Sequence, residues 1–485
     1  MVSSDSKVKK SLIKFFRNTF SELNSCEVVD VKESYRLPTS KVKVQITEHP
    51  FQLNLFPDGK SLHLYPERAL DDDENNDGPK RFILFDPDSY YNNRISGFYR
   101  LNDGDKIILG GKDAEQRAFL NISKETPARK LSIANEDGEL IFKALVNNPQ
   151  SCIAPLLKDK KVNQLVNWRL SKLKRIKEYF GGPIELLPKA EALSLIREVN
   201  RILEDEAYRP KDTRGKPGGV VHLPDESSVI ILGDLHAKSD NLLTLLSQNS
   251  YLEALENGTA SLVLIGDAVH PEGEVPLDEM QGSMLIMDLI MKLKVRFPQQ
   301  VFYLRGNHDS FSEEIAKGGI PQGLLWEQEL ISSRGTEYRD EMARFYDQLP
   351  YLIYSTNFVS CHAAAPTTRT ELDDLINLLQ QPKLINELIN NRLQRPNRPA
   401  GYTKGDVKRL KKCLDIDPDV PFIVGHTPLS NDDTIWENVD EIKNHHILYS
   451  SDTRWVGVMA QIGNKLYPFR YPVEQVSKRI NADSD

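Results

Sequence analysis

Five short polar clusters follow five apolar runs, and their side chains are of the types that bind divalent metal ions. Carboxylate oxygens, amide oxygens and imidazole nitrogens are all common ligands of such ions. One Gly-Asp or Gly-His pair is common at the end of any strand, but five such clusters in one chain predict a metal site. Its predicted ligands are Asp234, His236, Asp267, Asn307, His362 and His426.

The spacing of these residues indicates two ions rather than one. Asp234 and His236 are two positions apart, so in an extended segment they project to the same side and can bind one ion. The Asp267 carboxylate has two oxygens and can bridge two ions. Two ions about 3.5–4 Å apart lower the pKa of a bound water and neutralise phosphate charge. Because phosphate monoesters hydrolyse extremely slowly without a catalyst, this site suits their hydrolysis.

The elements that must position these residues are predicted to be buried strands alternating with helices. The apolar runs are VIILGD, LVLIGD, VFYLRGNHD, NFVSCH and PFIVGH, and helical patterns at 241–255 and 283–297 separate the first three. This alternation predicts a layered α/β fold in which strands present residues at their C-terminal ends. We assign the methionine-rich stretch Met284 to Met291 to the core.

The rest of the chain predicts a separate domain before this one. Residues 1–27 have the pattern of a short amphipathic helix, and residues 28–157 hold strand-length segments separated by turns, which predicts an all-β sandwich. A helix-rich stretch at 158–210 opens the α/β domain, which we expect to span 158–485. Residues 367–418 have a helical pattern and are a candidate cap over the site.

Composition restricts the class of protein. The chain has 485 residues, 39% of them hydrophobic and 27% charged, as in ordinary globular proteins of more than one domain. The net charge of −8 argues against a broad nucleic-acid-binding surface, and no apolar run approaches the ~18 residues of a membrane span. Four scattered cysteines fit reduced thiols. We therefore expect a cytoplasmic protein without nucleic-acid or membrane partners.

The series GDLH, GDAVH, GNHD, a strand-end His and GHT resembles the calcineurin-like metallophosphoesterases, especially their phosphoprotein phosphatase branch. The resemblance covers roughly Lys158 to Pro472. It implies that Asp234 and His236 hold the first metal, that Asp267 bridges, and that Asn307, His362 and His426 hold the second. It also implies that His308 is the general acid and that the metals are manganese, iron or zinc. Many members have a further His at the position of Pro428. The protein phosphatases lack that His, as this chain does.

The second motif departs from this family. Members typically read GDxVDRG, whereas this chain has Gly266-Asp267-Ala268-Val269-His270-Pro271. The family's orienting Asp is thus replaced by His270, and its phosphate-binding Arg by Pro271. We expect His270 and Asp309 to surround the site as supporting residues. Another arginine must bind the substrate phosphate, because a guanidinium suits bidentate phosphate recognition. The candidates are Arg305, Arg369, Arg392, Arg398 and Arg454.

The first domain faintly resembles a forkhead-associated domain. The resemblance lies in residues 101–110, which read LNDGDKIILG, and in residues 129–133, which read RKLSI. It implies a sandwich that binds phosphothreonine peptides, although Gly110-Gly111 stands where the family has Gly-Arg. The alternative is a structural or partner-docking sandwich, so a protein partner is expected in either case.

These observations predict a two-metal phosphatase that removes phosphate from serine and threonine in proteins. Two rivals within the enzyme class are a phosphotyrosine phosphatase and a hydrolase of small molecules such as dinucleoside polyphosphates. A third rival is a phosphopeptide-binding module whose phosphatase site has decayed. An alternative location is the cytosol of a host cell, reached as a secreted bacterial effector.

Overall fold

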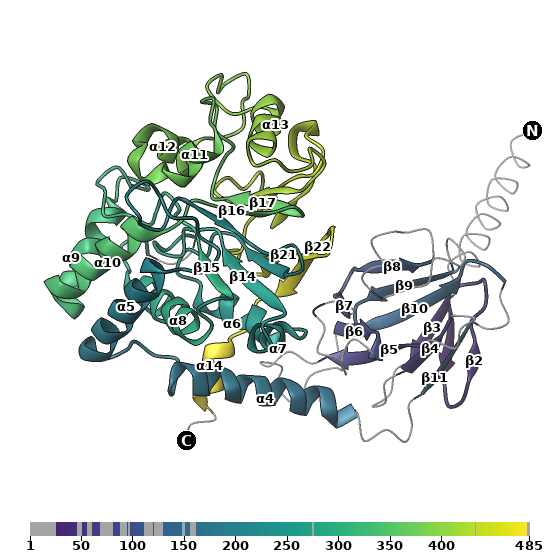
Figure 1. The fold of residues 1–485 in the computed structure, drawn as a ribbon. Helices are drawn as coiled ribbons and strands as arrows, with labels where there is room; N and C mark the ends of the chain where they lie inside the picture. Colours follow the sequence, from purple (N-terminus) through teal and green to yellow (C-terminus); the bar gives the residue numbers. More distant parts are fainter. Residues whose placement is uncertain are drawn as a thin grey trace, which may run out of the picture. The chain divides into compact units, whose positions relative to one another are not determined.

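The computed structural model describes residues 26–45, 51–55, 61–67, 81–87, 95, 98–110, 120, 130–147, 151–155, 162–273, 276–431 and 433–482. The chain divides into two compact units, an N-terminal unit that holds most of residues 1–165 and a C-terminal unit that holds residues 166–485 together with Ile95 (Figure 1). Each unit is described by itself. The amphipathic helix predicted for residues 1–27 lies almost wholly outside the described residues.

The described elements of the N-terminal unit that lie wholly before Leu165 are strands in two sheets, apart from a helical residue at Pro87. One sheet has the order β1-β3-β10-β9-β8 and the other the order β2-β11-β4-β5-β6-β7. This confirms the predicted all-β region. The strands are β1 (Glu27–Asp30), β2 (Tyr35–Arg36), β3 (Val42–Gln45), β4 (Phe51–Asn54), β5 (Ser61–Glu67), β6 (Arg81–Phe85), β7 (Phe98–Leu101), β8 (Lys106–Leu109), β9 (Leu131–Glu136), β10 (Glu139–Ala144) and β11 (Cys152–Pro155).

Both sheets of the N-terminal unit bury alternate side chains, which is the pattern of two sheets packed face to face. Val42 and Val44 of β3 are buried in one sheet, and Phe51 and Leu53 of β4 in the other. Residues 101–110 run from the end of β7 through a turn at Gly104 (φ +80°) into β8. Arg129 and Gly111 lie outside the described residues. Phosphopeptide binding by this unit therefore stays a prediction.

The C-terminal unit contains two sheets, with strand orders β12-β16-β17-β18-β20-β19 and β15-β14-β13-β21-β22. Strands β13, β14 and β15 are parallel, as are β17, β18 and β20. With helices packed against the sheets, this confirms the predicted layered α/β architecture. The strands are β12 (Val220–His222), β13 (Ser228–Leu232), β14 (Ala260–Leu264), β15 (Val301–Tyr303), β16 (Leu352–Ser355), β17 (Phe358–Cys361), β18 (Phe422–Val424), β19 (Ile435–Trp436), β20 (His445–Leu448), β21 (Trp455–Ile462) and β22 (Lys465–Pro472).

The core of the C-terminal unit lies between these two sheets. It joins Ile231 and Val263 of the five-stranded sheet to Ile353, Phe358 and Ile423 of the six-stranded sheet. Because both faces of the inner strands are covered, their sequences read as continuous apolar runs rather than alternating ones. This packing fixes the strand ends at which the polar clusters begin.

Helices cover the outer face of each sheet (Figure 1). Met284, Met287 and Met291 of α8 are buried, which confirms that the methionine-rich stretch belongs to the core. The helical pattern at 241–255 forms two helices, because Asn249 adopts φ +40° between them. The helices here are α4 (Val162–Phe180), α5 (Lys189–Glu204), α6 (Ser239–Ser247), α7 (Tyr251–Glu256), α8 (Gln281–Arg296), α9 (Gln322–Arg334), α10 (Thr336–Gln348) and α14 (Val476–Ala482).

Residues 367–418 are largely helical, as their pattern predicts. They contain α11 (Leu372–Ile376), a 3-10 turn η1 (Leu378–Gln380), α12 (Pro382–Asn390) and α13 (Lys404–Cys413). Leu388 of α12 and Leu410 of α13 join Val424 and Ile447 of the six-stranded sheet in a second apolar cluster. The insertion is thus anchored beside the strand ends, and its irregular residues 391–403 connect α12 to α13.

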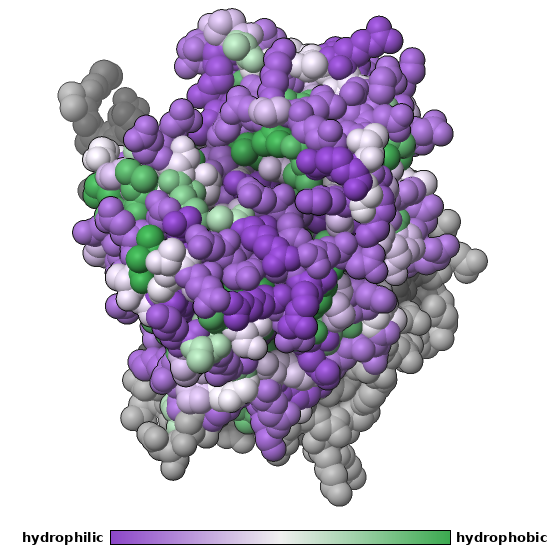
Figure 2. All heavy atoms as spheres, turned by 60° about the vertical axis from the view of Figure 1, so that its left-hand side comes forward, coloured by the Kyte–Doolittle hydropathy of each residue, from purple (hydrophilic) through white to green (hydrophobic). Residues whose placement is uncertain are grey.

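The surface on the side of α9, α10 and α12 is mainly hydrophilic (Figure 2). Its apolar residues form small separate groups, and Ile331 of α9 is one of few large apolar side chains that are exposed. Isolated apolar residues of this kind are normal on a protein surface. In the part of the chain that the structure describes, no helix has the length and apolar character needed to cross a membrane.

Candidate active site

The ends of five parallel-running strands bring the predicted metal ligands together. Asp234 follows β13, Asp267 follows β14, Asn307 follows β15, His362 follows β17 and His426 follows β18. Ligand sites of α/β proteins form at the C-terminal ends of strands, because neighbouring strands end at one edge. A bridge between Asp234 and Tyr449 joins the two sheets at this edge.

The ligand atoms form two groups that share one carboxylate. Asp234, His236 and Asp267 make the first group, and Asp267, His362 and His426 make the second, with the atoms of each group within 4.8 Å of one another. The Asn307 Oδ1 atom lies 3.0 Å from His362 Nε2, which places Asn307 beside the second group. A shared carboxylate between two ligand groups is the arrangement that a bridged pair of ions requires.

Two glycines allow the backbone to lie directly against the carboxylates of Asp267 and Asp234. A β-carbon at Gly306 would overlap the Asp267 carboxylate, and one at Gly425 would overlap the carboxylate of Asp234. The glycines of GNHD and GHT are therefore needed so that backbone can lie against the ligands. The His426 N–H uses this proximity and donates to Asp234 Oδ2 at 3.0 Å.

Several site residues adopt left-handed backbone conformations that non-glycine residues rarely take. The φ angles are +42° at His236, +53° at Asp267, +67° at His270 and +65° at His426. Such residues cluster at functional sites, where the surrounding structure holds them in place. Three predicted ligands and their neighbour His270 thus adopt this uncommon conformation.

Backbone carbonyls fix the orientation of two histidine rings. His362 Nδ1 donates to the Ile265 carbonyl at 2.8 Å, and His236 Nδ1 donates to the His270 carbonyl at 3.1 Å. Each ring therefore presents the lone pair of Nε2 to the cluster. Metal-binding histidines are usually held by such a hydrogen bond on the other ring nitrogen.

The cluster fits divalent cations by its charge and its unpaired atoms. His426 Nε2 is buried and has no hydrogen-bond partner among the described residues. Burial lowers the pKa of His362, but the carboxylates of Asp267 and Asp234 outweigh burial and raise that pKa to about 9. The two carboxylates thus stabilise positive charge at the place where a cation would supply it.

His308 lies between the cluster and His270. The Nδ1 atoms of the two rings are 3.0 Å apart, so one nitrogen donates a proton and the other accepts it. The Nε2 atom of His308 remains available to a substrate. Burial lowers the pKa of His308 to about 4, although the carboxylate of Asp267 opposes this shift. His270 is thus placed where it can hold the ring of His308.

Asp309 binds backbone rather than ligands. Its Oδ2 atom accepts from the N–H of Gly306 at 2.8 Å and of Asp267 at 3.1 Å, and its Oδ1 accepts from the Tyr303 hydroxyl at 2.7 Å. These bonds join the loop after β15 to the loop after β14. Asp309 therefore supports the geometry of both ligand groups.

The candidate arginines lie in different places. Arg305 donates to the Tyr346 carbonyl at the end of α10, and Arg454 donates to the Asn431 carbonyl at 3.1 Å. Arg369 is exposed beside Glu371. Arg392 and Arg398 line a pocket of about 140 Å³ that reaches Ala363 and Gly425, next to two of the metal ligands. Among these candidates, the structure brings Arg392 and Arg398 to the strand ends.

Four further residues belong to the neighbourhood but were missed by sequence reasoning. Glu272 Oε1 lies 3.7 Å from His236 Nε2, and Tyr449 donates to Glu272 Oε2 at 2.9 Å. Arg395 and Thr427 line the arginine-containing pocket. The sequence contained signals for three of them. Glu272 comes just after GDAVHP, Arg395 lies in the basic run RLQRPNR, and Tyr449 follows the apolar run HHIL.

Comparison with known proteins agrees with this geometry. Residues 227–452 match the family model described as calcineurin-like phosphoesterase. These residues are a calcineurin-like phosphoesterase domain. The domain contains all six predicted ligands, and its family implies divalent metal ions.

Two curated relatives match parts of this chain. The serine/threonine-protein phosphatase C23G10.1 of Caenorhabditis elegans is 24% identical over 40% of this chain and 42% of its own. The serine/threonine-protein phosphatase SIT4 of Candida albicans is 32% identical over 18% of this chain and 25% of its own. The matches thus span less than half of either relative.

Solved structures with similarity to the chain include two phosphatases. A Saccharomyces cerevisiae protein serine/threonine phosphatase with similarity to human phosphatase PP5 has 16% identity and a TM-score of 0.44, over 59% of this chain and 90% of its own. The cold-active protein-tyrosine phosphatase of a psychrophilic Shewanella species has 15% identity and a TM-score of 0.36, over 53% of this chain and 82% of its own.

Proposed function

We propose that this protein is a two-metal phosphatase that hydrolyses phosphoserine and phosphothreonine in proteins. The observation that carries the proposal is the pair of ligand groups joined by Asp267. Asp234 and His236 would hold the first ion, and Asn307, His362 and His426 the second. When bound, the ions supply positive charge that neutralises the phosphate and lowers the pKa of an attacking water.

The protein's own residues supply the remaining chemistry. His308 donates a proton from Nε2 to the leaving oxygen, because its Nδ1 atom is engaged by His270. For this step both ring nitrogens of His308 are protonated, so His308 Nδ1 donates a hydrogen bond and His270 Nδ1 accepts it. His270 thereby takes the position of the family's orienting carboxylate, with a neutral acceptor in place of a charged one.

Arg392 is our candidate for the group that binds the substrate phosphate. Burial lowers the pKa of this guanidinium, the charge of Arg398 lowers it further, and the carboxylate of Asp234 raises it. The charges of Arg392 and of Asp234, a predicted ligand of the first metal, therefore interact. A guanidinium in this position binds phosphate oxygens in a bidentate manner and replaces the arginine missing at Pro271.

Turnover of p-nitrophenyl phosphate tests the reaction. We expect activity that requires added Mn²⁺ and that is lost in Asp267→Asn. Absence of metal-dependent turnover in the folded protein would contradict the proposal and favour the binding-module rival. With an active enzyme, kcat/KM for matched phosphoserine, phosphothreonine and phosphotyrosine peptides and for a dinucleoside polyphosphate then identifies the substrate class.

A further inference from the structure

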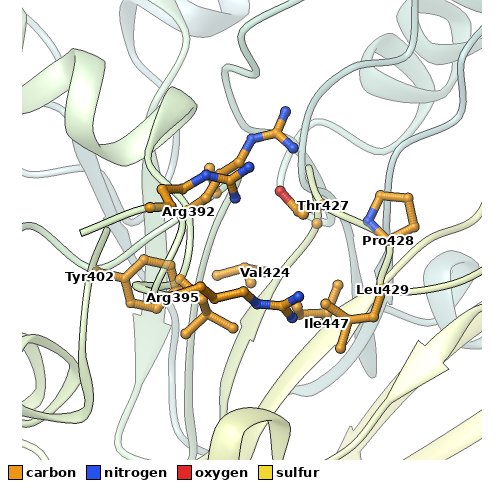
Figure 3. A pocket seen from close by; sticks show the side chains of 12 residues that line it. Arg392, Arg395, Tyr402, Val424, Thr427, Pro428, Leu429 and Ile447 are labelled. Atoms are coloured by element: carbon orange, nitrogen blue, oxygen red, sulfur yellow. The ribbon is translucent and has the colours of Figure 1, made fainter. Parts of the chain in front are cut away.

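The insertion between the last two histidine ligands forms one wall of a positively charged pocket. Arg392, Arg395 and Arg398 line this wall, and Thr427 and Leu429 line the opposite one. Figure 3 shows the side chains of Arg392 and Arg395 extending toward Thr427, Leu429 and Ile447. The floor is apolar and includes Tyr402, Val424 and Ile447. Three guanidinium groups thus line a space of about 140 Å³.

The three arginine side chains and the Thr427 hydroxyl of this pocket lack partners within the described part of the chain. The guanidinium groups of Arg392, Arg395 and Arg398 form no ion pair there, unlike Arg409 of α13, which pairs with Asp406. Thr427 Oγ1 is buried and has no hydrogen-bond partner. Like charges gathered without a counter-ion repel one another, and a buried hydroxyl without a partner is costly. An oxyanion in the pocket would neutralise the charges of the arginines and accept a hydrogen bond from the Thr427 hydroxyl.

The pocket lies beside the predicted metal centre. Ala363 and Gly425, which adjoin the predicted ligands His362 and His426 in the chain, line it together with the three arginines. An anion held by these arginines would therefore lie next to the metal centre.

We propose that Arg395, Arg398 and Thr427 bind a second phosphate group on the same phosphopeptide while Arg392 and the metal centre bind the phosphate that is removed. This inference rests on the proposed function. Phosphate suits the site because its oxygens can accept from two guanidinium groups and a hydroxyl at once. The protein would then prefer substrates that carry two neighbouring phosphoresidues.

Peptides that share one sequence test this preference. They carry one phosphoserine, two phosphoserines at spacings of one to four residues, or one phosphoserine beside a glutamate. For the wild-type enzyme we expect kcat/KM to be at least tenfold higher for a doubly phosphorylated peptide than for the singly phosphorylated one. In the double variant Arg395→Gln, Arg398→Gln this advantage should be lost, so that kcat/KM for the two peptides agrees within about twofold, because the charged hydrogen bonds to the second phosphate are lost.

Two controls separate this inference from its rivals. Turnover of p-nitrophenyl phosphate should stay within about twofold in Arg395→Gln alone, and Lys408→Gln, an exposed residue of the same insertion, should change neither assay. Equal losses on every substrate would overturn the inference, since these arginines would then bind the scissile phosphate. An equal preference for the glutamate peptide would show that the pocket binds any anionic side chain and would overturn the phosphate assignment.

Failure of the inference is distinguishable from failure of the proposed function. If p-nitrophenyl phosphate is not hydrolysed at all, the proposed function fails. Fluorescence anisotropy with the same labelled peptides and the Asp267→Asn protein then measures the pocket without turnover. Tighter binding of a doubly phosphorylated peptide, lost in the variant that also carries Arg395→Gln and Arg398→Gln, supports the pocket. Equal affinity for all peptides overturns it.

Discussion

The strand ends and the insertion at 367–418 contribute to one site in different ways. The metal ligands lie on loops that follow buried parallel strands, and neighbouring backbone approaches them so closely that Gly306 and Gly425 admit no side chain. The pocket arginines lie on the irregular connection between α12 and α13. The comparison teaches that the predicted ligands are held by close backbone contacts at the strand ends, whereas the pocket arginines lie on a connection outside the sheets and helices.

The largest effect is expected at the shared carboxylate. Asp267→Asn should lower metal-dependent turnover of p-nitrophenyl phosphate by at least about 1,000-fold, because a metal site supplies several kcal/mol of charge stabilisation. Metal analysis of the purified protein by mass spectrometry should show fewer bound ions than in the wild type. A variant that keeps both ions and its activity would contradict the bridging role.

Removal of the proton donor should have the next largest effect. His308→Asn should lower kcat by roughly 100- to 10,000-fold for a phosphoserine peptide, whose alkoxide leaving group needs a proton. The loss should be much smaller for p-nitrophenyl phosphate, since nitrophenolate leaves without protonation. Measurement of kcat for both substrates checks this contrast, and equal losses would show that His308 has another role.

A third variant tests whether the insertion binds substrate independently of the metal ligands at the strand ends. Arg392→Gln should lower kcat/KM for all phosphate monoesters by roughly 10- to 100-fold, while the metal content stays unchanged. Arg392→Lys should recover only part of the loss, because an ammonium group lacks the planar fork of a guanidinium. If Arg392→Gln loses metal as well, the insertion and the strand ends are not separate in function.

The smallest effect should be a change in pH dependence at His270. In His270→Asp an Oδ atom can take the place of His270 Nδ1, so a carboxylate would face His308 Nδ1 in place of a neutral ring. An added negative charge favours the protonated form of His308 and raises its pKa. The basic limb of the kcat profile should therefore move to higher pH. His270→Asn adds no charge and should leave this limb unmoved, which separates charge from shape.

The sequence predicted that the polar residues after the strands lie together, and it did so for a physical reason. Buried strands produce apolar runs, and the residues that follow them must converge where parallel strands end, so Asp234, Asp267 and His426 could be grouped without coordinates. Helices at 162–180 and 281–296 follow in the same way from periodicity. The break between α6 and α7 was missed, because the left-handed Asn249 leaves no mark in the apolar pattern.

The pocket could not be predicted in the same manner. Arg395 differs from other arginines of the chain only in what lies opposite its side chain, and the facing residue Thr427 comes from a different element. The Nδ1–Nδ1 contact of His270 and His308 likewise depends on side-chain orientation across two loops. Distance in three dimensions, rather than residue type, decides both features, and it is not contained in spacing along the chain.

The insertion also has a consequence for evolution and design. It leaves the sheet after β17 and returns at β18, and these two strands are parallel neighbours. It is therefore a crossover connection that returns from the end of β17 to the start of β18, and another segment can replace it only if it spans this distance. Exchange of residues 367–418 between members of the family thus offers a route to new substrate selectivity on an unchanged hydrolytic scaffold.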